Sequence, residues 1–344
     1  MKKQSKLSLM WFTVNRNCNF RCSWCYAASC EYYVENEMSL QFALDNLKIA
    51  VDLGIKRLFL IGGEPTLWPH LLDFNDAMKI ANVQSTLVSN AYRFSDDHFW
   101  ERYKDHPNTH IGVSFKAFDE QSLIENTGSS NFAMVTKGLR RIFDYQRNSI
   151  ASFVYSRPYT SHFMDMVKYA VDCGAFGVSV NFCSPAIYKD HVDDRFMVDV
   201  DTLVKEITSN YEEANAITKG RLVLVMKYPL CIWPREFVQT LKARNQISTT
   251  CHLQHQNGCI IDTDGSALIC NSMLNFPIGK HGQDFNSAES LDALFGSKTV
   301  GDYFAKIRAY PSKKCIDCEV FKDCSGGCPL LWTSLSPDLV IKGW

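Results

Sequence analysis

Residues 11–25, WFTVNRNCNFRCSWC, join a short β-rich run to three closely spaced cysteines. Residues 11–14 are apolar, aromatic or β-branched, so they predict a strand. Cys18, Cys22 and Cys25 follow with C-x3-C-x2-C spacing, which puts three thiols into the loop after that strand. We therefore expect three thiols, which are common metal ligands, at the carboxyl end of the first strand.

Further β-rich runs occupy residues 57–61, 85–89, 110–115, 150–155 and 177–182, and helical patterns lie between them. Ser39 and Ser161 are each placed to cap one of these helices. Six strand–helix repeats predict a parallel sheet, because parallel neighbours need long crossovers. The pattern becomes irregular after about residue 220, so we expect a partial, six-stranded (β/α)6 TIM-like barrel. Its active residues should lie at the carboxyl ends of the strands.

The character of the chain changes near residue 230, which predicts one domain over 1–228 and a second over 229–344. Helices are expected at 234–244 and near 290–308. A hairpin is expected at 259–270, where Asp264-Gly265 separates two apolar pairs. This region carries eight cysteines, and all but Cys231 form the array Cys251, Cys259, Cys270, Cys315, Cys318, Cys324 and Cys328.

The composition limits the classes of partner. The 344 residues have a formal net charge of -1 and no basic stripe, so nucleic acid is not an expected partner. No apolar run approaches the roughly 20 residues that cross a bilayer, and the first 14 residues lack a cleavage site. Because there is no export signal, the 14 clustered cysteines favour metal or iron–sulfur ligation in a reducing cytosol over disulfides.

The N-terminal cysteine triple suits one particular cofactor. Three thiolates in so short a loop can bind three irons of a [4Fe–4S] cluster and leave the fourth iron open. An open iron can chelate S-adenosylmethionine (SAM), and one electron then cleaves SAM to a 5′-deoxyadenosyl radical. The alternative is a zinc site of three cysteines and another ligand, although zinc sites usually pair C-x2-C with a distant second pair.

The cysteine triple, with an aromatic residue just before its third cysteine, resembles the radical SAM superfamily. Gly62-Gly63-Glu64 follows the second strand and resembles the GGE motif of that family, in which the glutamate and adjoining backbone bind the SAM ammonium. Lys116 or Arg157 is expected to pair with the SAM carboxylate, since the arginine found after strand four in many relatives is absent here. The residues that the resemblance implies for SAM binding are Trp24, Gly62, Gly63, Glu64, Asn90, Ser114, Lys116 and Arg157.

The C-terminal array resembles the SPASM extension of radical SAM enzymes, which usually holds two auxiliary [4Fe–4S] clusters. The resemblance assigns cluster I to Cys251, Cys259, Cys270 and Cys328, and cluster II to Cys315, Cys318 and Cys324. No cysteine after Cys328 supplies the last ligand of cluster II. Cluster II therefore has an open iron, takes Asp317 or Asp323 as its fourth ligand, or is absent. A structural zinc ribbon is the alternative interpretation of the C-terminal cysteine array. Cys30, Cys173, Cys183 and Cys231 are interpreted as buried small hydrophobic residues.

The resemblance implies a radical SAM enzyme that crosslinks, oxidises or epimerises a ribosomally made precursor peptide. The alternatives are a dehydrogenase or mutase of a small metabolite, and a non-catalytic zinc-stabilised relative. Asn271 stands where sulfatase maturases carry a basic aspartate, so Asp262 is the candidate base, whereas Asp264 is interpreted as a turn residue. A flavodoxin- or ferredoxin-type reductant is expected. Only 17 residues precede Cys18, so a separate leader-binding protein is a further possible partner.

Overall fold

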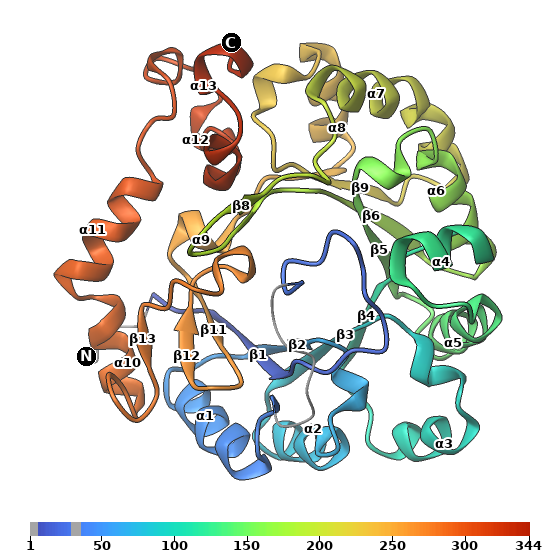
Figure 1. The fold of residues 1–344 in the computed structure, drawn as a ribbon, viewed down its shortest axis with the longest axis vertical. Coiled ribbons are helices and arrows are strands. Elements are labelled where there is room, and N and C mark those ends of the chain that lie inside the picture. The colour runs from blue at the N-terminus through green and yellow to red at the C-terminus, as the bar shows by residue number, and fades with distance from the viewer. Residues whose placement is uncertain (1–5, 29–35) are drawn as a thin grey trace.

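A computed structural model describes residues 6–28 and 36–344, and Cys30 lies outside these described residues. One sheet curves through the molecule in the strand order β10-β9-β6-β5-β4-β3-β2-β1-β11-β12-β13 (Figure 1). The strands of this sheet from β10 to β11 pair in parallel, and the last two additions are antiparallel. The partial α/β barrel with a cysteine-rich C-terminal region is thereby confirmed.

All six predicted strands form, within two residues of the expected ends, and helices lie along the outer face of the sheet (Figure 1). The strands are β1 (Leu9–Asn15), β2 (Arg57–Gly62), β3 (Gln84–Ser89), β4 (His110–Ser114), β5 (Ile150–Tyr155), β6 (Gly177–Phe182), β7 (Ala186–Ile187), β8 (Val192–Asp193), β9 (Leu222–Val225), β10 (Ile247–Ser248), β11 (Gly258–Ile261), β12 (Ser266–Leu268) and β13 (Gly279–Lys280). Fully buried side chains such as Phe12 of β1 pack against the helices, here against Phe74.

Helices follow most of the parallel strands and cover the sheet. They are α1 (Leu40–Asp52), α2 (Leu71–Ile80), α3 (Asp97–Asp105), α4 (Glu120–Thr127), α5 (Phe132–Tyr145), α6 (Phe163–Asp172), α7 (Val200–Ile217), α8 (Arg235–Ala243), α9 (His252–His255), α10 (Ala288–Phe295), α11 (Lys298–Ile307), α12 (Phe321–Cys324) and α13 (Pro337–Val340). Ser39 caps α1 as predicted, by accepting from the amide of Phe42. The prediction for Ser161 is wrong: His162 is the N-cap of α6, and Ser161 has a left-handed backbone with φ of 71°.

The sheet extends past the six predicted strands on both sides. Strand β9 pairs in parallel with β6, and β11 pairs in parallel with β1. Both additions are only four residues long and do not follow the regular strand–helix spacing, which is why the irregular pattern after residue 220 concealed β9. The division into two domains at residues 228/229 remains a prediction. Strand β11, which lies on the C-terminal side of that division, pairs with the free side of β1.

The C-terminal region contains the predicted hairpin. Ile260 pairs with Leu268 in antiparallel register, and Gly265 takes a φ of 85° in the connecting turn. The single helix expected near 290–308 is instead two helices, α10 and α11. The break follows because Ser297 turns to extended backbone and its hydroxyl accepts from the amide of Val300, starting a new helix. Within the described ranges, none of the helices is both long and apolar enough to cross a membrane.

Candidate active site

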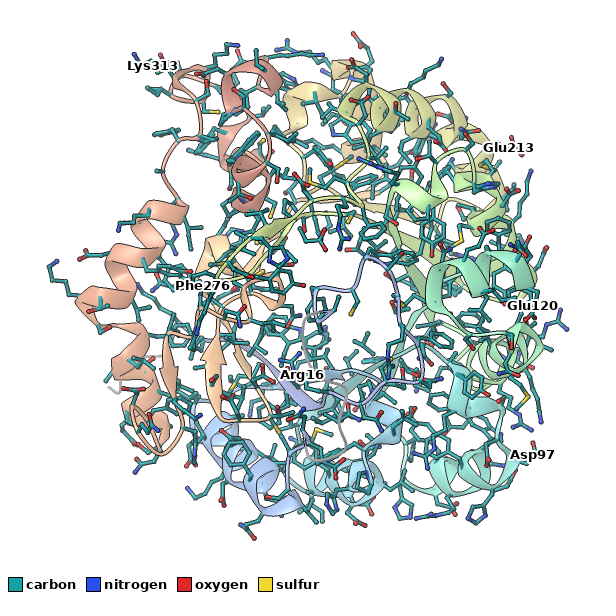
Figure 2. All side chains as sticks on the ribbon, viewed as in Figure 1. Arg16, Asp97, Glu120, Glu213, Phe276 and Lys313 are labelled. Atoms are coloured by element: carbon teal, nitrogen blue, oxygen red, sulfur yellow. The ribbon has the colours of Figure 1, made fainter. Side chains whose placement is uncertain are left out.

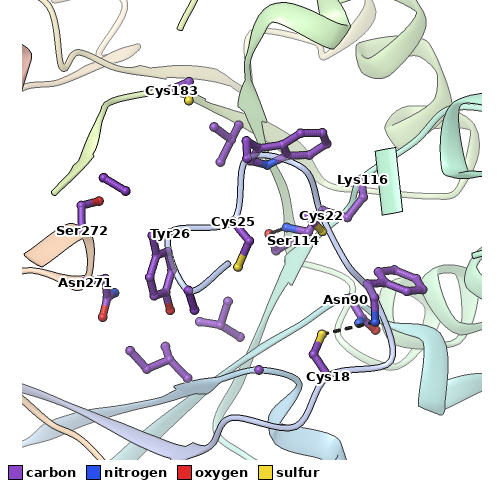
Figure 3. Close-up of a pocket in the computed structure, with 18 of the residues that line it drawn as sticks. Cys18, Cys22, Cys25, Tyr26, Asn90, Ser114, Lys116, Cys183, Asn271 and Ser272 are labelled. Atoms are coloured by element: carbon purple, nitrogen blue, oxygen red, sulfur yellow. Dashed lines mark hydrogen bonds between the residues drawn. The ribbon is translucent and has the colours of Figure 1, made fainter. Parts of the chain in front are cut away.

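The three N-terminal cysteines lie around one pocket of about 300 Å³ (Figure 3). The loop that carries them leaves β1 at Asn15 and crosses the carboxyl ends of β2, β3 and β4 (Figure 1). The ends of these strands supply much of the lining, including Gly62, Gly63, Glu64, Ser89, Asn90 and Ser114. This is the face on which parallel α/β barrels carry their active sites.

The cysteine loop is held by bonds to neighbouring elements. The amides of Arg21 and Ser23 donate to the carbonyls of Thr127 and Asn126, at 2.9 and 3.1 Å. The ring of Trp24 lies edge-on to that of Tyr159, with 5.0 Å between centroids. These contacts tie the loop to the end of α4 and to the turn after β5, so the thiols are positioned before any cofactor binds.

The thiols are withdrawn from water. Burial, aided by the nearby Glu64 carboxylate, raises the pKa of Cys18 to about 12. Burial also raises the pKa of Cys22 to about 11, and the Lys116 ammonium opposes this rise. Without a cation both thiols stay protonated at neutral pH, so binding of a metal cluster must displace their protons.

The residues present fit a cluster bound by three thiolates. Cys18, Cys22 and Cys25 belong to one short loop and face one cavity, and the amide of Phe20 donates to the Cys18 sulfur over 3.4 Å (Figure 3). In residues 6–28 and 36–344, no three cysteine, histidine, aspartate or glutamate side chains converge as ligands of one metal ion would. In a [4Fe–4S] cluster each thiolate binds a different iron, so the three sulfurs need not converge on one point.

The glycine pair brings the end of β2 against the start of the cysteine loop. The amide of Gly63 donates to the Asn15 carbonyl at 2.9 Å, and that of Glu64 to the Asn17 carbonyl at 2.8 Å. A Cβ on Gly63 would lie 2.2 Å from the Asn17 oxygen. No side chain fits there, so glycine is needed for this close approach.

Glu64 joins the ends of β2 and β3. It is 2% exposed, and one carboxylate oxygen accepts from the Thr66 hydroxyl at 2.7 Å and the Ser89 hydroxyl at 2.8 Å. The other oxygen accepts from the amide of Asn90 at 2.8 Å. Burial raises the pKa of Glu64 despite these bonds. Both oxygens therefore already have partners within the chain, while binding of the SAM ammonium remains a prediction.

Asn90, Ser114 and Lys116 form one wall of the pocket (Figure 3). The Asn90 side-chain amide donates to the Asn19 side chain at 2.9 Å, which links β3 to the cysteine loop. The Lys116 ammonium donates to the Ser114 hydroxyl. Lys116 thus places a positive charge beside the thiols, and this charge stabilises the Cys22 thiolate.

Two other candidates do not belong to this wall. The described residues that line the pocket include neither Arg157 nor Asp262. Arg157 is exposed, and its guanidinium Nε donates to the Met197 carbonyl at 3.3 Å. Asp262 is buried and forms an ion pair with Arg16. The structure thus brings together all the predicted SAM-binding residues except Arg157.

The opposite wall contains residues that the sequence reasoning did not assign to the site, although it had considered Cys183 and Asn271. Cys183, Ser184 and Lys227 line it, and the Lys227 ammonium donates to the Ser184 hydroxyl at 3.2 Å. Asn271 and Ser272 follow the hairpin and face the same cavity (Figure 3). Lys227 follows β9, so recognition of that short strand would have identified it.

Three of the cysteines that the resemblance assigns to cluster I are close to one another. Burial raises the pKa of Cys328 to about 12, opposed by Lys227 and reinforced by Cys270 and Cys251, so these three thiols are electrostatic neighbours. Cys259 is fully buried on β11, and its thiol donates to the Ile260 carbonyl over 3.8 Å. Cys315, Cys318 and Cys324 lie further along the chain, in and around two short helical turns.

Comparison with known proteins identifies the class. Residues 12–170 match the family model of the radical SAM superfamily, and this segment contains the cysteine triple and the GGE sequence. This match assigns residues 12–170 to the radical SAM superfamily, as the sequence resemblance predicted.

Its curated relatives include two proteins named GTP 3′,8-cyclase. The one from Mannheimia succiniciproducens is 30% identical over 133 residues, covering 37% of this chain and 38% of the relative. The one from Helicobacter pylori (strain HPAG1) is 37% identical over 78 residues, covering 22% and 24%. The chain therefore aligns with well under half the length of these relatives.

Solved structures match the fold along almost the whole chain. The structure of anSMEcpe with bound AdoMet has a TM-score of 0.70 at 17% identity, covering 94% of this chain and 89% of that one. Streptococcus suis SuiB bound to the precursor peptide SuiA also has a TM-score of 0.70, at 18% identity and with 96% and 74% coverage. These likenesses show a shared fold that includes the C-terminal region.

Proposed function

We propose that this radical SAM enzyme binds a [4Fe–4S] cluster through Cys18, Cys22 and Cys25 and abstracts a hydrogen atom from a precursor peptide. The observation that carries the proposal is the arrangement of three free thiols from one loop around a pocket at the carboxyl ends of parallel strands. One or two auxiliary clusters accompany it in the C-terminal region, which suits a reducing compartment.

The bound cofactors supply reductive cleavage of SAM to a 5′-deoxyadenosyl radical. The chain supplies position and charge. Lys116, beside Cys22 and bonded to Ser114, is placed to receive the carboxylate of an amino-acid group. Glu64 fixes the ends of β2 and β3 relative to each other through Ser89 and Asn90. Burial of the Cys18 and Cys22 thiols limits their contact with water.

A peptide substrate is supported by the fold likeness to SuiB bound to its precursor peptide and to anSMEcpe with bound AdoMet and the Cp18Cys peptide. The pocket of about 300 Å³ is at the small end for ligand sites. Lys227, Ser184, Asn271 and Ser272 would then contact the substrate from the opposite wall.

The test uses anaerobically reconstituted protein, dithionite, SAM and a short peptide encoded beside the gene. The expected products are 5′-deoxyadenosine and a peptide of altered mass, with deuterium transferred from a labelled peptide to 5′-deoxyadenosine. Cys18→Ala should abolish both products. Cys173→Ala should not, because Cys173 is a buried cysteine at the C-cap of α6, far from the loop in sequence. If reconstituted protein never consumes SAM, the proposal fails.

A small metabolite is the second candidate substrate, because the curated relatives carry the name GTP 3′,8-cyclase. The polar wall formed by Lys227, Ser184 and Asn271 could recognise such a molecule through charge and hydrogen bonds. Deuterium transfer to 5′-deoxyadenosine from a labelled metabolite, with no mass change in any neighbouring peptide, would favour this candidate over the first.

A further inference from the structure

The loop after β9 packs directly against the last cysteine array. The amide of Cys328 donates to the Lys227 carbonyl at 2.6 Å, and the amide of Leu230 donates to the Cys324 sulfur at 3.2 Å. A Cβ on Gly327 would lie 2.8 Å from the Lys227 carbonyl oxygen. Residues 227–232 and 324–328 are therefore in close backbone contact, although the chain separates them widely.

This contact brings Cys231 into the second cysteine group. Cys231 lies on a 3₁₀ turn, Leu230–Ile232, and forms a buried cluster with Cys315 and Ile341. Phe321, Trp332 and Trp344 pack around that cluster. The amide of Lys342 donates to the Cys231 sulfur over 3.4 Å. Sulfurs that receive backbone N–H bonds within an apolar shell are typical of iron–sulfur ligands.

Electrostatic neighbours agree with this geometry. Burial raises the pKa of the Cys315 thiol, and a backbone hydrogen bond opposes this rise. The negative charges of Cys231 and then Cys318 raise the pKa further. Cys231 also raises the pKa of Cys324, after burial and opposing backbone bonds. Cys231 is thus a neighbour of both Cys315 and Cys324, and Cys315 is a neighbour of Cys318.

We propose that Cys231 is the fourth ligand of auxiliary cluster II, together with Cys315, Cys318 and Cys324. This inference rests on the proposed presence of auxiliary clusters but is independent of the substrate. It replaces the aspartate ligands considered from the sequence: Asp323 is ion-paired with Lys242, and Asp317 is exposed. It also closes the cluster, because four thiolates leave no iron free for substrate. A closed cluster of this kind suits electron transfer.

The test removes the N-terminal cluster so that only auxiliary iron remains. Full-length Cys18→Ala/Cys22→Ala/Cys25→Ala protein is reconstituted anaerobically, and iron, sulfide and the EPR spectrum after reduction are measured. Adding Cys231→Ala should lower iron and sulfide by about a half, the loss of one of two clusters, or leave a cluster whose EPR spectrum now changes with imidazole. Cys324→Ala is the positive control, and Cys173→Ala should change neither quantity.

Each other outcome has its own meaning. The role of Cys231 is overturned if a folded Cys231→Ala protein keeps its iron content and its EPR spectrum does not change with imidazole, while Cys324→Ala still loses iron. If Cys324→Ala also loses none, cluster II is absent and the role of Cys231 fails with it. If the parent holds no iron, both proposed auxiliary clusters fail. Cys231→Ser, whose side chain has nearly the same size, repeats the measurement if circular dichroism shows that Cys231→Ala does not fold.

Discussion

Arg16 and Asp262 form a buried ion pair across 246 positions of the chain. Arg16 directly follows β1 and precedes the cysteine loop, and Asp262 begins the turn of the β11–β12 hairpin. Figure 2 shows Arg16 near the centre of the ring of helices, whereas Asp97, Glu120 and Glu213 lie on its outer rim. The pair therefore fixes the base of the candidate active site to the C-terminal region.

Asp262→Asn should destabilise the protein by about 3 kcal/mol, because Arg16 would be left buried without its carboxylate partner. Urea unfolding of the purified protein measures this change. Asp264→Asn is the matched control: Asp264 pairs with Lys280 at the surface, so its loss should cost under about 1 kcal/mol. If Asp262→Asn kept full stability and lost only turnover, Asp262 would instead act as the base that the sequence suggested.

Gly63→Ala should prevent the cysteine loop from reaching its position, because the added methyl group would overlap the Asn17 carbonyl. We expect a loss of about 2 kcal/mol in unfolding free energy and lower iron content after reconstitution. Gly301→Ala places a methyl group where nothing lies within 4 Å on α11, and should be neutral or stabilise by up to about 1 kcal/mol. Equal behaviour of the two variants would contradict the close approach described for Gly63.

Lys116→Ala should weaken SAM binding by about tenfold or more, because a charged hydrogen bond to the carboxylate contributes about 1.5–3 kcal/mol. The measurement is the SAM concentration that gives half-maximal 5′-deoxyadenosine formation. Arg157→Ala is the control, since Arg157 is exposed and bonds to the Met197 carbonyl. A loss of SAM affinity in Arg157→Ala, with none in Lys116→Ala, would reverse the assignment.

Glu64→Gln should alter how stability depends on pH. Burial raises the pKa of Glu64 above its ordinary value of 4.5, so the folded state holds this proton more tightly than the unfolded chain. The contribution of this proton is complete below pH 4.5 and is lost as the pH rises through the folded pKa. We compare the unfolding free energies of the wild-type protein and Glu64→Gln at several pH values. The difference in favour of the wild type should therefore become smaller from acidic to neutral pH. An advantage that grows with pH would show a lowered pKa instead.

Protein prepared without oxygen should contain iron and sulfide in similar amounts, and the Cys18→Ala/Cys22→Ala/Cys25→Ala variant should lose about four irons per chain. Elemental analysis together with sulfide determination provides the measurement. Cys173→Ala again serves as the control. Zinc without sulfide would support the non-catalytic, zinc-stabilised alternative.

Local patterns in the sequence predicted most of the barrel and much of the candidate site. The strands are continuous apolar runs, and the cysteine triple follows one of them, so neighbours in sequence are also neighbours in space. Cys231 could not be recognised this way, because its partners come from a distant segment and no spacing rule links them. The Arg16–Asp262 pair escaped for the same reason, and β9 was too short to stand out from an irregular region.

Strand β1 is hydrogen-bonded on one side to β2 and on the other to β11. Residues 258–261 leave the ribosome long after the cysteine loop, with a delay on the order of tens of seconds at typical rates of synthesis. Strand β1, from which the loop departs, thus gains its second neighbour only when most of the polypeptide has been made. We therefore expect the proposed cluster to be loaded stably only late in synthesis, and C-terminal truncation should impair the site at the opposite end of the chain.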